Sequence, residues 1–320
     1  MNKIWNLPTT HLISFSEIDE KRPVLLVTSS PAWQAVKNKL HFKPAARVEV
    51  NEAKTAHWDA LLATVDAQTA VVYAVGGGLV ADASKYMAVK LGLPMVCLPT
   101  ALSVDAFITF ASGIRRDGSV YYIETKTPET LILDLEVIAA APASIRAAGV
   151  TDVMSIATGC WDWQFAHEQQ RNPPGMEFIP WVYANAQSIL KGVLDCAEAA
   201  GRGDHDGLKT LYDCLSTEVQ LCNQVGHSRP EEGSEHYFAY AVENEMGHGL
   251  PHGDLVGPGI LLIAERQGQN VEAFRRALLS CNIPLDHISP DMVQRTFDVL
   301  PAFCQKHRLP FGIAHIEVHR

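Results

Sequence analysis

The chain has 320 residues, of which 47% are hydrophobic and 19% are charged, a composition typical of a globular protein and not of a disordered one. At roughly 150 residues per domain, this length predicts about two domains. The formal net charge of −10 disfavours nucleic acid and anionic lipid as general partners, because a surface this acidic repels phosphate groups.

The sequence shows no sign of export or membrane insertion. Its apolar runs are strand-sized, well short of the ~20 residues that a membrane-spanning helix needs. The N-terminal stretch has no apolar segment after a basic start, so we expect no signal peptide. The cysteines are odd in number, scattered and without a CxxC motif, which favours a reducing compartment. We therefore expect a cytoplasmic protein.

In the N-terminal part, short apolar runs of strand length alternate with helical stretches. The predicted strands are residues 24–28, 47–50, 71–75, 95–98 and 131–134. Between them, 56–65 and 81–91 carry apolar residues at helical spacing. This alternation predicts a Rossmann-like α/β domain with a mostly parallel sheet covered by helices.

From about residue 149 the strand signal stops. Leu208, Leu211, Leu215 and Cys222 fall on one helical face, and similar patterns occupy 181–200, 255–266 and 290–306. The sequence therefore predicts an α/β domain over 1–148, which would bind a dinucleotide. An all-α domain over 149–320 would follow it and hold a metal and a substrate.

A glycine-rich turn follows the predicted strand 71–75, in the segment VVYAVGGGLVADASK. We expect Gly76, Gly77 and Gly78 to form the turn and a helix to begin near Leu79. Glycines let the backbone approach a pyrophosphate, and a helix N-terminus offers unpaired N–H groups. The motif is not GxGxxG, so an ordinary strand–helix turn is the alternative. Asp82 would lie in the first helical turn, where a carboxylate can simply cap.

A second polar loop follows the next strand, in MVCLPTALSVDAF, with Thr100, Ser103 and Asp105. In an open α/β sheet, ligands gather at the carboxyl ends of the strands. The two loops together therefore predict a dinucleotide crevice. Simple turn chemistry is the alternative reading of Thr100 and Ser103.

Two histidine-containing segments of the helical part suggest a metal centre. His236 lies in HSRPEEGSEH and His252 in HGLPHGDLVG, a separation that can place both on neighbouring helices. Two imidazoles and one carboxylate are a typical catalytic zinc set with an open position. Spacing alone does not choose the carboxylate. His248 competes with His252, although Pro251 argues against both projecting from one regular helical turn.

Five segments, in order, resemble a known family: GGGLVADASK, LPTALSVDAFIT, AAGVTDVMSIATGCWDW, SRPEEGSEH and HGDLVG. They resemble glycerol-1-phosphate dehydrogenases, within the superfamily of iron-containing alcohol dehydrogenases and 3-dehydroquinate synthases. The resemblance covers about residues 70–260. It implies a dehydroquinate synthase-like fold, a homo-oligomer such as a dimer, and reversible hydride transfer between a nicotinamide and a small, phosphorylated ketone or alcohol such as dihydroxyacetone phosphate.

The resemblance also implies roles for individual residues. Asp152, His236 and His252 would bind the catalytic metal, usually zinc, with nickel or iron as alternatives; this metal would polarise the substrate carbonyl. Asp105 and Asp152 would contact the substrate. The cofactor, NAD or NADP, would be lined by Gly76, Gly77, Gly78, Leu79, Val80, Ala81, Asp82, Thr100, Ser103 and Thr109.

Some residues depart from the family pattern. The usual Asp-Gly after the Thr-x-x-Ser turn is Asp105-Ala106, and the serine that usually touches the cofactor is Thr109. The histidine expected four residues after His236, a substrate contact, is Tyr240. Because tyrosine carries no positive charge near neutral pH, this site would bind a phosphorylated substrate poorly if the histidine normally holds it. The alternative is that Tyr240 is a core aromatic residue.

Three further features complete the sequence evidence. Ser29 and Ser30 follow the first predicted strand, where relatives often place an acid, and the absence of that charge relaxes discrimination against NADP. Asp162 and Trp163 are expected to be structural, with the indole filling the core beside the metal helix. Arg229 could reach a phosphate or cap the loop that positions His236.

Two other functions remain open from the sequence. A sugar-phosphate cyclase of the 3-dehydroquinate synthase type would share the cofactor and metal and would consume no net NADH. We rank it lower because FASGIRRDGS stands where such enzymes carry a lysine-rich site. A non-catalytic nucleotide-binding paralogue is supported by Tyr240 and Ala106, whereas an intact set of metal ligands argues against it.

Overall fold

In the computed structural model, residues 4–65 and 68–317 are described, and they form two compact units. One unit comprises Trp5–Arg116 and Val120–Pro142, and we call it the α/β unit. The other comprises residue 4, Asp117–Ser119 and residues 143–317, and we call it the helical unit.

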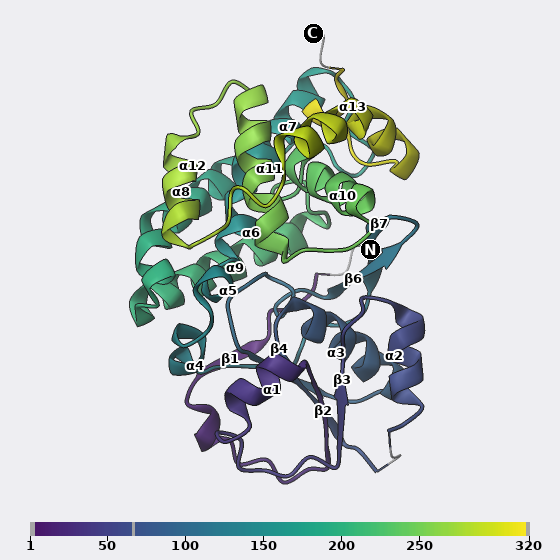
Figure 1. Cartoon of the computed structure of the whole chain (residues 1–320), viewed down its shortest axis with the longest axis vertical. Helices are drawn as coiled ribbons and strands as arrows, with labels where there is room; N and C mark the ends of the chain where they lie inside the picture. Colours follow the sequence, from purple (N-terminus) through teal and green to yellow (C-terminus); the bar gives the residue numbers. More distant parts are fainter. Residues whose placement is uncertain (1–3, 66–67, 318–320) are drawn as a thin grey trace. The chain divides into compact units, whose positions relative to one another are not determined.

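The α/β unit contains a six-stranded parallel sheet in the order β1-β8-β5-β4-β2-β3 (Figure 1). Its strands are β1 (Thr9–Leu12), β2 (Val24–Thr28), β3 (Ala46–Glu49), β4 (Val71–Gly76), β5 (Met95–Pro99) and β8 (Thr130–Leu133). A separate two-stranded sheet consists of β6 (Ala111–Arg116) and β7 (Ser119–Glu124). The helices are η1 (Phe15–Glu17), α1 (Ser30–Val36), α2 (Thr55–Leu62), α3 (Gly78–Leu91) and α4 (Leu135–Ala139).

The strand order reverses between β2 and β4. From β2 the chain crosses through α1 to β3 on one side, whereas from β4 it crosses through α3 to β5 on the other. Because such crossovers are right-handed, the two directions place α1 and α3 on opposite faces of the sheet. The reversal is a topological switch point, where open α/β sheets form a crevice for ligands. The glycine turn after β4 lies at this point.

The sheet is built from strands that are buried on both faces. All five residues of β2 and all six of β4 are buried, as expected for a parallel sheet covered by helices. On the face that α1 covers, Leu26, Tyr73 and Leu98 form part of one apolar cluster with Val36 of α1. Burial of these continuous apolar runs fixes the carboxyl ends of β4 and β5 in one place.

The helical unit consists of α-helices and one short 3-10 helix. They are α5 (Ala143–Arg146), α6 (Val150–Met154), α7 (Ile156–Glu168), α8 (Pro180–Arg202), α9 (His205–Val225), α10 (Ser234–Met246), α11 (His252–Arg266), α12 (Glu272–Ser280), α13 (Pro290–His307) and η2 (Ile313–His315). The long helices α8 and α9 pack against each other, and α10 contacts α11 and α13 (Figure 1). Within the described residues, none of the helices combines the length and the apolar character needed to cross a bilayer.

The five predicted strands are confirmed as β2, β3, β4, β5 and β8, and the helical patterns at 181–200, 255–266 and 290–306 are α8, α11 and α13. The prediction missed β1, which is short and mostly exposed, and the β6–β7 pair, whose Asp117-Gly118 turn is a typical hairpin signal. Helix α3 begins at Gly78, which confirms the expected start near Leu79, but Asp82 lies in its second turn and not in its first.

The carboxylate of Glu20 gives the α/β unit an acid-sensitive contact. It accepts hydrogen bonds from Arg22 Nη2 at 2.6 Å and from Tyr73 Oη at 2.8 Å. The hydrogen bonds of Arg22, and to a smaller degree that of Tyr73, lower the pKa of Glu20 from 4.5 to about 2, although burial opposes the shift. A depressed folded-state pKa stabilises the protein above pH 4.5, and this contribution disappears as the pH falls towards 2.

We therefore expect Glu20→Gln to lower the free energy of unfolding at pH 7 by about 1 kcal/mol, a modest value because Arg22 is partly exposed. The difference from the wild type should shrink as the pH falls below 4.5. Urea unfolding at a series of pH values measures it, with the exposed Asp19 changed to Asn as a control. A difference that is the same at every pH would contradict the assignment.

Candidate metal and dinucleotide sites

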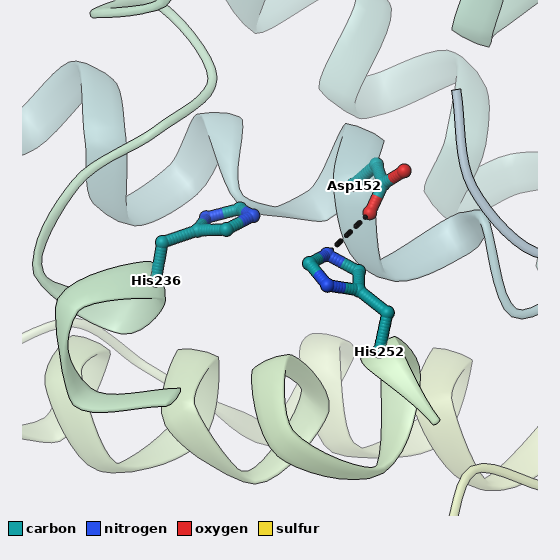
Figure 2. A group of neighbouring side chains, drawn as sticks. All are labelled: Asp152, His236 and His252. Carbon is teal, nitrogen blue, oxygen red and sulfur yellow. Dashed lines mark ion pairs between the residues drawn. The ribbon is translucent and has the colours of Figure 1, made fainter. Parts of the chain in front are cut away.

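Three side chains of the helical unit converge on one point. Asp152, His236 and His252 each offer one ligand atom, and these atoms lie within 4.8 Å of one another (Figure 2). The Nε2 atom of His252 is 2.9 Å from Oδ1 of Asp152. Two imidazoles and a carboxylate at this spacing match the donor set of catalytic zinc sites. The structure thus brings together the three residues that the sequence proposed as ligands.

Each of these side chains sits near the start of a helix. Asp152 lies in the first turn of α6, His236 in the first turn of α10, and His252 is the first residue of α11. Pro251 precedes α11 as its N-cap, as suits a residue without an N–H. His248 lies before this proline and is exposed. The geometry therefore favours His252 over His248 as the ligand.

Helices α10 and α11 approach each other closely beside the site. A Cβ atom added at Gly259 of α11 would lie 2.9 Å from the backbone oxygen of Glu235 in α10. A larger residue here would push the two helices apart. Because His236 and His252 are carried by these helices, the glycine helps to set the separation of the two imidazoles.

Glu235 orients the ring of His236. Its Oε1 atom is 2.8 Å from Nδ1 of His236 and also accepts from the backbone N–H of Gly233 at 2.7 Å. A metal-ligating histidine usually donates its second ring N–H to such a carboxylate, which leaves the other nitrogen to bind the metal. Burial opposes a charged His236 ring, but the hydrogen bond and charge of Glu235, with Glu232 and Asp152, raise the pKa of His236 to about 9.

We expect Glu235→Gln to weaken metal binding by roughly tenfold, because an amide holds the imidazole less firmly than a carboxylate does. Isothermal titration of the metal-free protein with zinc measures the affinity. Glu272→Gln, an exposed change at the start of α12, is the matched control. Equal zinc affinities of Glu235→Gln and the control would exclude this role of Glu235.

Tyr240 is buried one helical turn beyond His236, with a ring-centroid separation of 6.0 Å. Its hydroxyl donates a hydrogen bond of 2.8 Å to Oε1 of Glu232. Glu232 also accepts from Oγ of Ser228 at 2.8 Å. Tyr240 is therefore a core aromatic residue, as one of the two hypotheses about it states, and it also lies beside the candidate ligand His236.

In the α/β unit, the two predicted polar loops lie side by side. The backbone N–H of Thr100 donates to the backbone oxygen of Gly76 at 3.3 Å. A Cβ atom added at Gly77 would lie 3.3 Å from Oγ of Ser103, and one at Gly78 would lie 2.6 Å from Val104 Cγ2. Gly77 caps α3 without a side-chain hydrogen bond, so the first N–H groups of α3 are available to an anion.

The residues near the start of α3 have different surroundings. Leu79 in the first turn of α3 is half-buried, as are Thr100, Ser103 and Asp105 of the second loop, whereas Val80 and Ala81 are buried in the core. Asp82 is held 3.0 Å from Nζ of Lys85, whose side chain is 0% exposed. Lys85 Nζ also donates to Oγ1 of Thr109 at 3.2 Å and to the backbone oxygen of Ala111. This buried lysine therefore links α3 to the Thr109 segment.

Comparison with known proteins agrees with this arrangement. Residues 11–142 match the family described as iron-containing alcohol dehydrogenase. Glycerol-1-phosphate dehydrogenase [NAD(P)+] of Sulfurisphaera tokodaii is 30% identical over 268 residues, which cover 82% of this chain and 75% of that protein. The chain belongs to the iron-containing alcohol dehydrogenase family. The same-named enzyme of Pyrococcus furiosus is 30% identical over 66% of this chain and 60% of its own length.

The fold of this iron-containing alcohol dehydrogenase also has counterparts among solved structures. A probable glycerol dehydrogenase from Sinorhizobium meliloti superposes with a TM-score of 0.69 at 18% identity, over 95% of this chain and 88% of the other. At that identity the similarity shows the fold. The predicted dehydroquinate synthase-like architecture, an α/β part followed by a helical part, is confirmed in this sense.

Two buried residues of this family member, Glu235 and Lys85, were not predicted from its sequence. Glu235 precedes His236 directly, and a carboxylate next to a candidate ligand histidine was an available signal. Lys85 follows Asp82 by three residues on the buried side of α3, a spacing at which opposite charges meet. Both are buried charges, which the apolar periodicity of a helix does not reveal.

Proposed function

We propose that the chain is an NAD(P)-dependent, metal-containing oxidoreductase that interconverts sn-glycerol 1-phosphate and dihydroxyacetone phosphate by hydride transfer. The α/β unit would bind the dinucleotide, and the helical unit would bind the metal and the substrate. The observation that carries the proposal is the convergence of Asp152, His236 and His252 in a chain whose relatives are named glycerol-1-phosphate dehydrogenases.

The donor set fits a divalent metal such as zinc, with nickel or iron as alternatives. A metal held by Asp152, His236 and His252 would supply a Lewis acid for the oxygen of the substrate. The residues around this position would orient the metal ligands. Glu235 holds the proton at Nδ1 of His236, which leaves Nε2 to face the other two side chains. Asp152 and Asp105 are proposed to contact the substrate.

For the cofactor, the proposal rests on the switch point between β2 and β4. The N–H groups at the start of α3 would bind the pyrophosphate, with Ser103, Thr100 and Thr109 supplying hydroxyl groups along the nucleotide. Ser29 follows β2 at the position where an acid would repel a 2′-phosphate, so we propose that NADP is accepted as well as NAD. Similar dissociation constants for NADPH and NADH support this; an NADPH constant far above that for NADH would overturn it.

The test is an assay of NADH and NADPH oxidation by zinc- or nickel-loaded protein. Dihydroxyacetone phosphate is compared with dihydroxyacetone, which differs only in the phosphate. Turnover with the phosphorylated ketone, lost on chelation, supports the proposal. If only dihydroxyacetone reacts, hydride transfer is retained but the substrate is unphosphorylated. Tyr240, which replaces the family's substrate-contact histidine, would then be a determinant of that specificity. No turnover with either ketone would overturn the proposed reaction.

The proposal also covers the localisation and the oligomeric state of the protein. We propose that the protein works in the cytoplasm and that it forms a homo-oligomer such as a dimer, as the family resemblance implies. Sedimentation velocity of the purified chain tests the second point directly, and a monomer at micromolar concentration would overturn it.

A further inference from the structure

One carboxylate in the helical unit gathers four hydrogen-bond donors. Asp162 lies in α7 and is 0% exposed. Its Oδ2 atom accepts from the backbone N–H of Ser234 at 2.8 Å and from the Ser234 hydroxyl. Its Oδ1 atom accepts from the backbone N–H of Ile313 at 2.8 Å and from Nε2 of Gln267 at 3.2 Å.

Two of the donor residues lie in or next to helices that carry candidate metal ligands. Ser234 is the first residue of α10 and lies two positions before His236. Gln267 directly follows α11, the helix that begins with His252. Asp162 itself lies in α7, which follows α6 and Asp152 with a single residue between the two helices. One side chain of α7 therefore contacts both the first residue of α10 and the residue that follows α11.

The C-terminal segment closes the same cluster. Besides the bond from Ile313, the backbone N–H of Ala314 donates to Oγ of Ser234 at 2.9 Å. A Cβ atom added at Gly312 would lie 2.3 Å from Oδ2 of Asp162, so this segment is packed directly onto the carboxylate. The 3-10 helix η2 thus completes the surroundings of Asp162 and excludes water from them.

The geometry of the cluster favours a carboxyl group at this position over an amide. Four donors point at Asp162, and only a carboxylate has acceptor sites on both oxygens, because an asparagine would turn two N–H groups towards donors. Burial raises the pKa of Asp162, and the nearby charge of Arg229, together with the Ser234 hydroxyl and the Ile313 amide, opposes that shift. Arg229 is itself buried and donates to the backbone oxygen of Phe311 at 2.9 Å.

We propose that Asp162 is the positioning residue of the metal centre, whose carboxylate sets the separation of the His236 and His252 imidazoles by fixing the start of α10 against the end of α11. It touches neither metal nor substrate, and it acts through Ser234 and Gln267. The inference rests on the metal site of the proposed function.

The test is cobalt(II) binding to the metal-free full-length chain, followed by titration and by the visible absorption of the bound ion, which reports coordination geometry. For Asp162→Asn we expect affinity to fall by about tenfold or more, as for other partners of ligand side chains, and the absorption bands to shift. Asp195→Asn, an exposed change on α8, should bind cobalt like the wild type. Folding of each variant is checked by circular dichroism.

A merely structural Asp162 gives a different result. Its replacement would lower the melting temperature, but the folded variant would bind cobalt with wild-type affinity and spectrum, and this outcome would overturn the proposal. If Asp162→Asn does not fold, Ser234→Ala removes the hydroxyl contact and keeps the backbone N–H. We expect a several-fold loss of affinity with a shifted spectrum, and wild-type binding by this variant would equally overturn the proposal.

The readout separates this inference from the proposed reaction. Cobalt binding needs neither cofactor nor substrate. A wild-type protein that binds cobalt but leaves dihydroxyacetone phosphate unchanged would overturn the proposed reaction and not the role of Asp162. A wild-type protein that turns over the ketone, with unaltered cobalt binding in both variants, would overturn the role of Asp162 alone.

Discussion

Replacing His252 with alanine is expected to abolish metal binding and to lower turnover by at least about a thousandfold, while the fold stays intact. A catalytic metal stabilises the transition state by several kcal/mol, and each 1.36 kcal/mol of activation free energy corresponds to a factor of ten in rate. The His252 side chain is 27% exposed at the first position of α11, so its loss leaves no large cavity. Zinc titration, circular dichroism and the NAD(P)H assay measure the three quantities.

His248→Ala is the matched control for this experiment. His248 lies four positions earlier in the same segment, is exposed, and contacts the backbone oxygen of Gly249 through Nδ1 at 3.3 Å. We expect this variant to bind zinc and to turn over like the wild type. If the two variants exchanged their effects, His248 would be the ligand and the assignment of His252 would be wrong.

Replacing Lys85 with methionine is expected to lower the free energy of unfolding by about 3 kcal/mol, a large part of the 5–15 kcal/mol typical of a domain. The change removes the Nζ atom that lies 3.0 Å from Asp82, and with it the cation that contributes most to stabilising that buried carboxylate. It also removes the donor to Thr109, a residue proposed to line the cofactor. Urea unfolding measures the stability, and we expect NADH affinity to fall in parallel.

Two further variants isolate the contribution of the buried pair. Lys90→Met changes an exposed lysine of the same helix and should cost less than about 1 kcal/mol. The double variant Asp82→Asn with Lys85→Met should lose less than the sum of the single losses, because no charge is then left unpaired. A Lys85→Met variant as stable as Lys90→Met would show that the buried pair contributes nothing to stability.

The main architecture could be predicted because burial leaves a direct trace in the sequence. Strand β4 is apolar at five consecutive positions, and α8 and α9 repeat apolar residues at helical spacing. Strand β1 left no such trace, since Thr9, Leu12 and His11 are exposed on a sheet edge. Edge strands are stabilised by their pairing partner, here β8, and pairing cannot be read from a local pattern.

The residues of the candidate site likewise fall into those that could be predicted from the sequence and those that could not. The two histidines could be proposed from residue type and spacing, and the carboxylate Asp152 from the family resemblance. The supporting residues were not predicted. Glu235 contacts Gly233 and His236 beside it in the chain, a local signal that was passed over. Lys85 and Asp162 act through hydrogen bonds to segments far along the chain. Asp162, for example, binds the backbone of Ser234 and of Ile313, which are 72 and 151 positions away. Such contacts exist only once the helices have packed.

The ion pair between Asp152 and His252 bears on how this protein should be handled in the laboratory. Oδ1 of Asp152 lies 2.9 Å from Nε2 of His252, and both side chains are held by helices that the fold itself positions. We therefore expect the protein to stay folded when a chelator removes its metal, and to bind metal again afterwards. The metal found in a purified batch would then record what the growth medium and the buffers supplied. Preparations grown or purified differently would then differ in activity, although gels, mass and the melting curve of the stripped chain would not distinguish them. The metal content should therefore be measured by elemental analysis whenever a rate is measured.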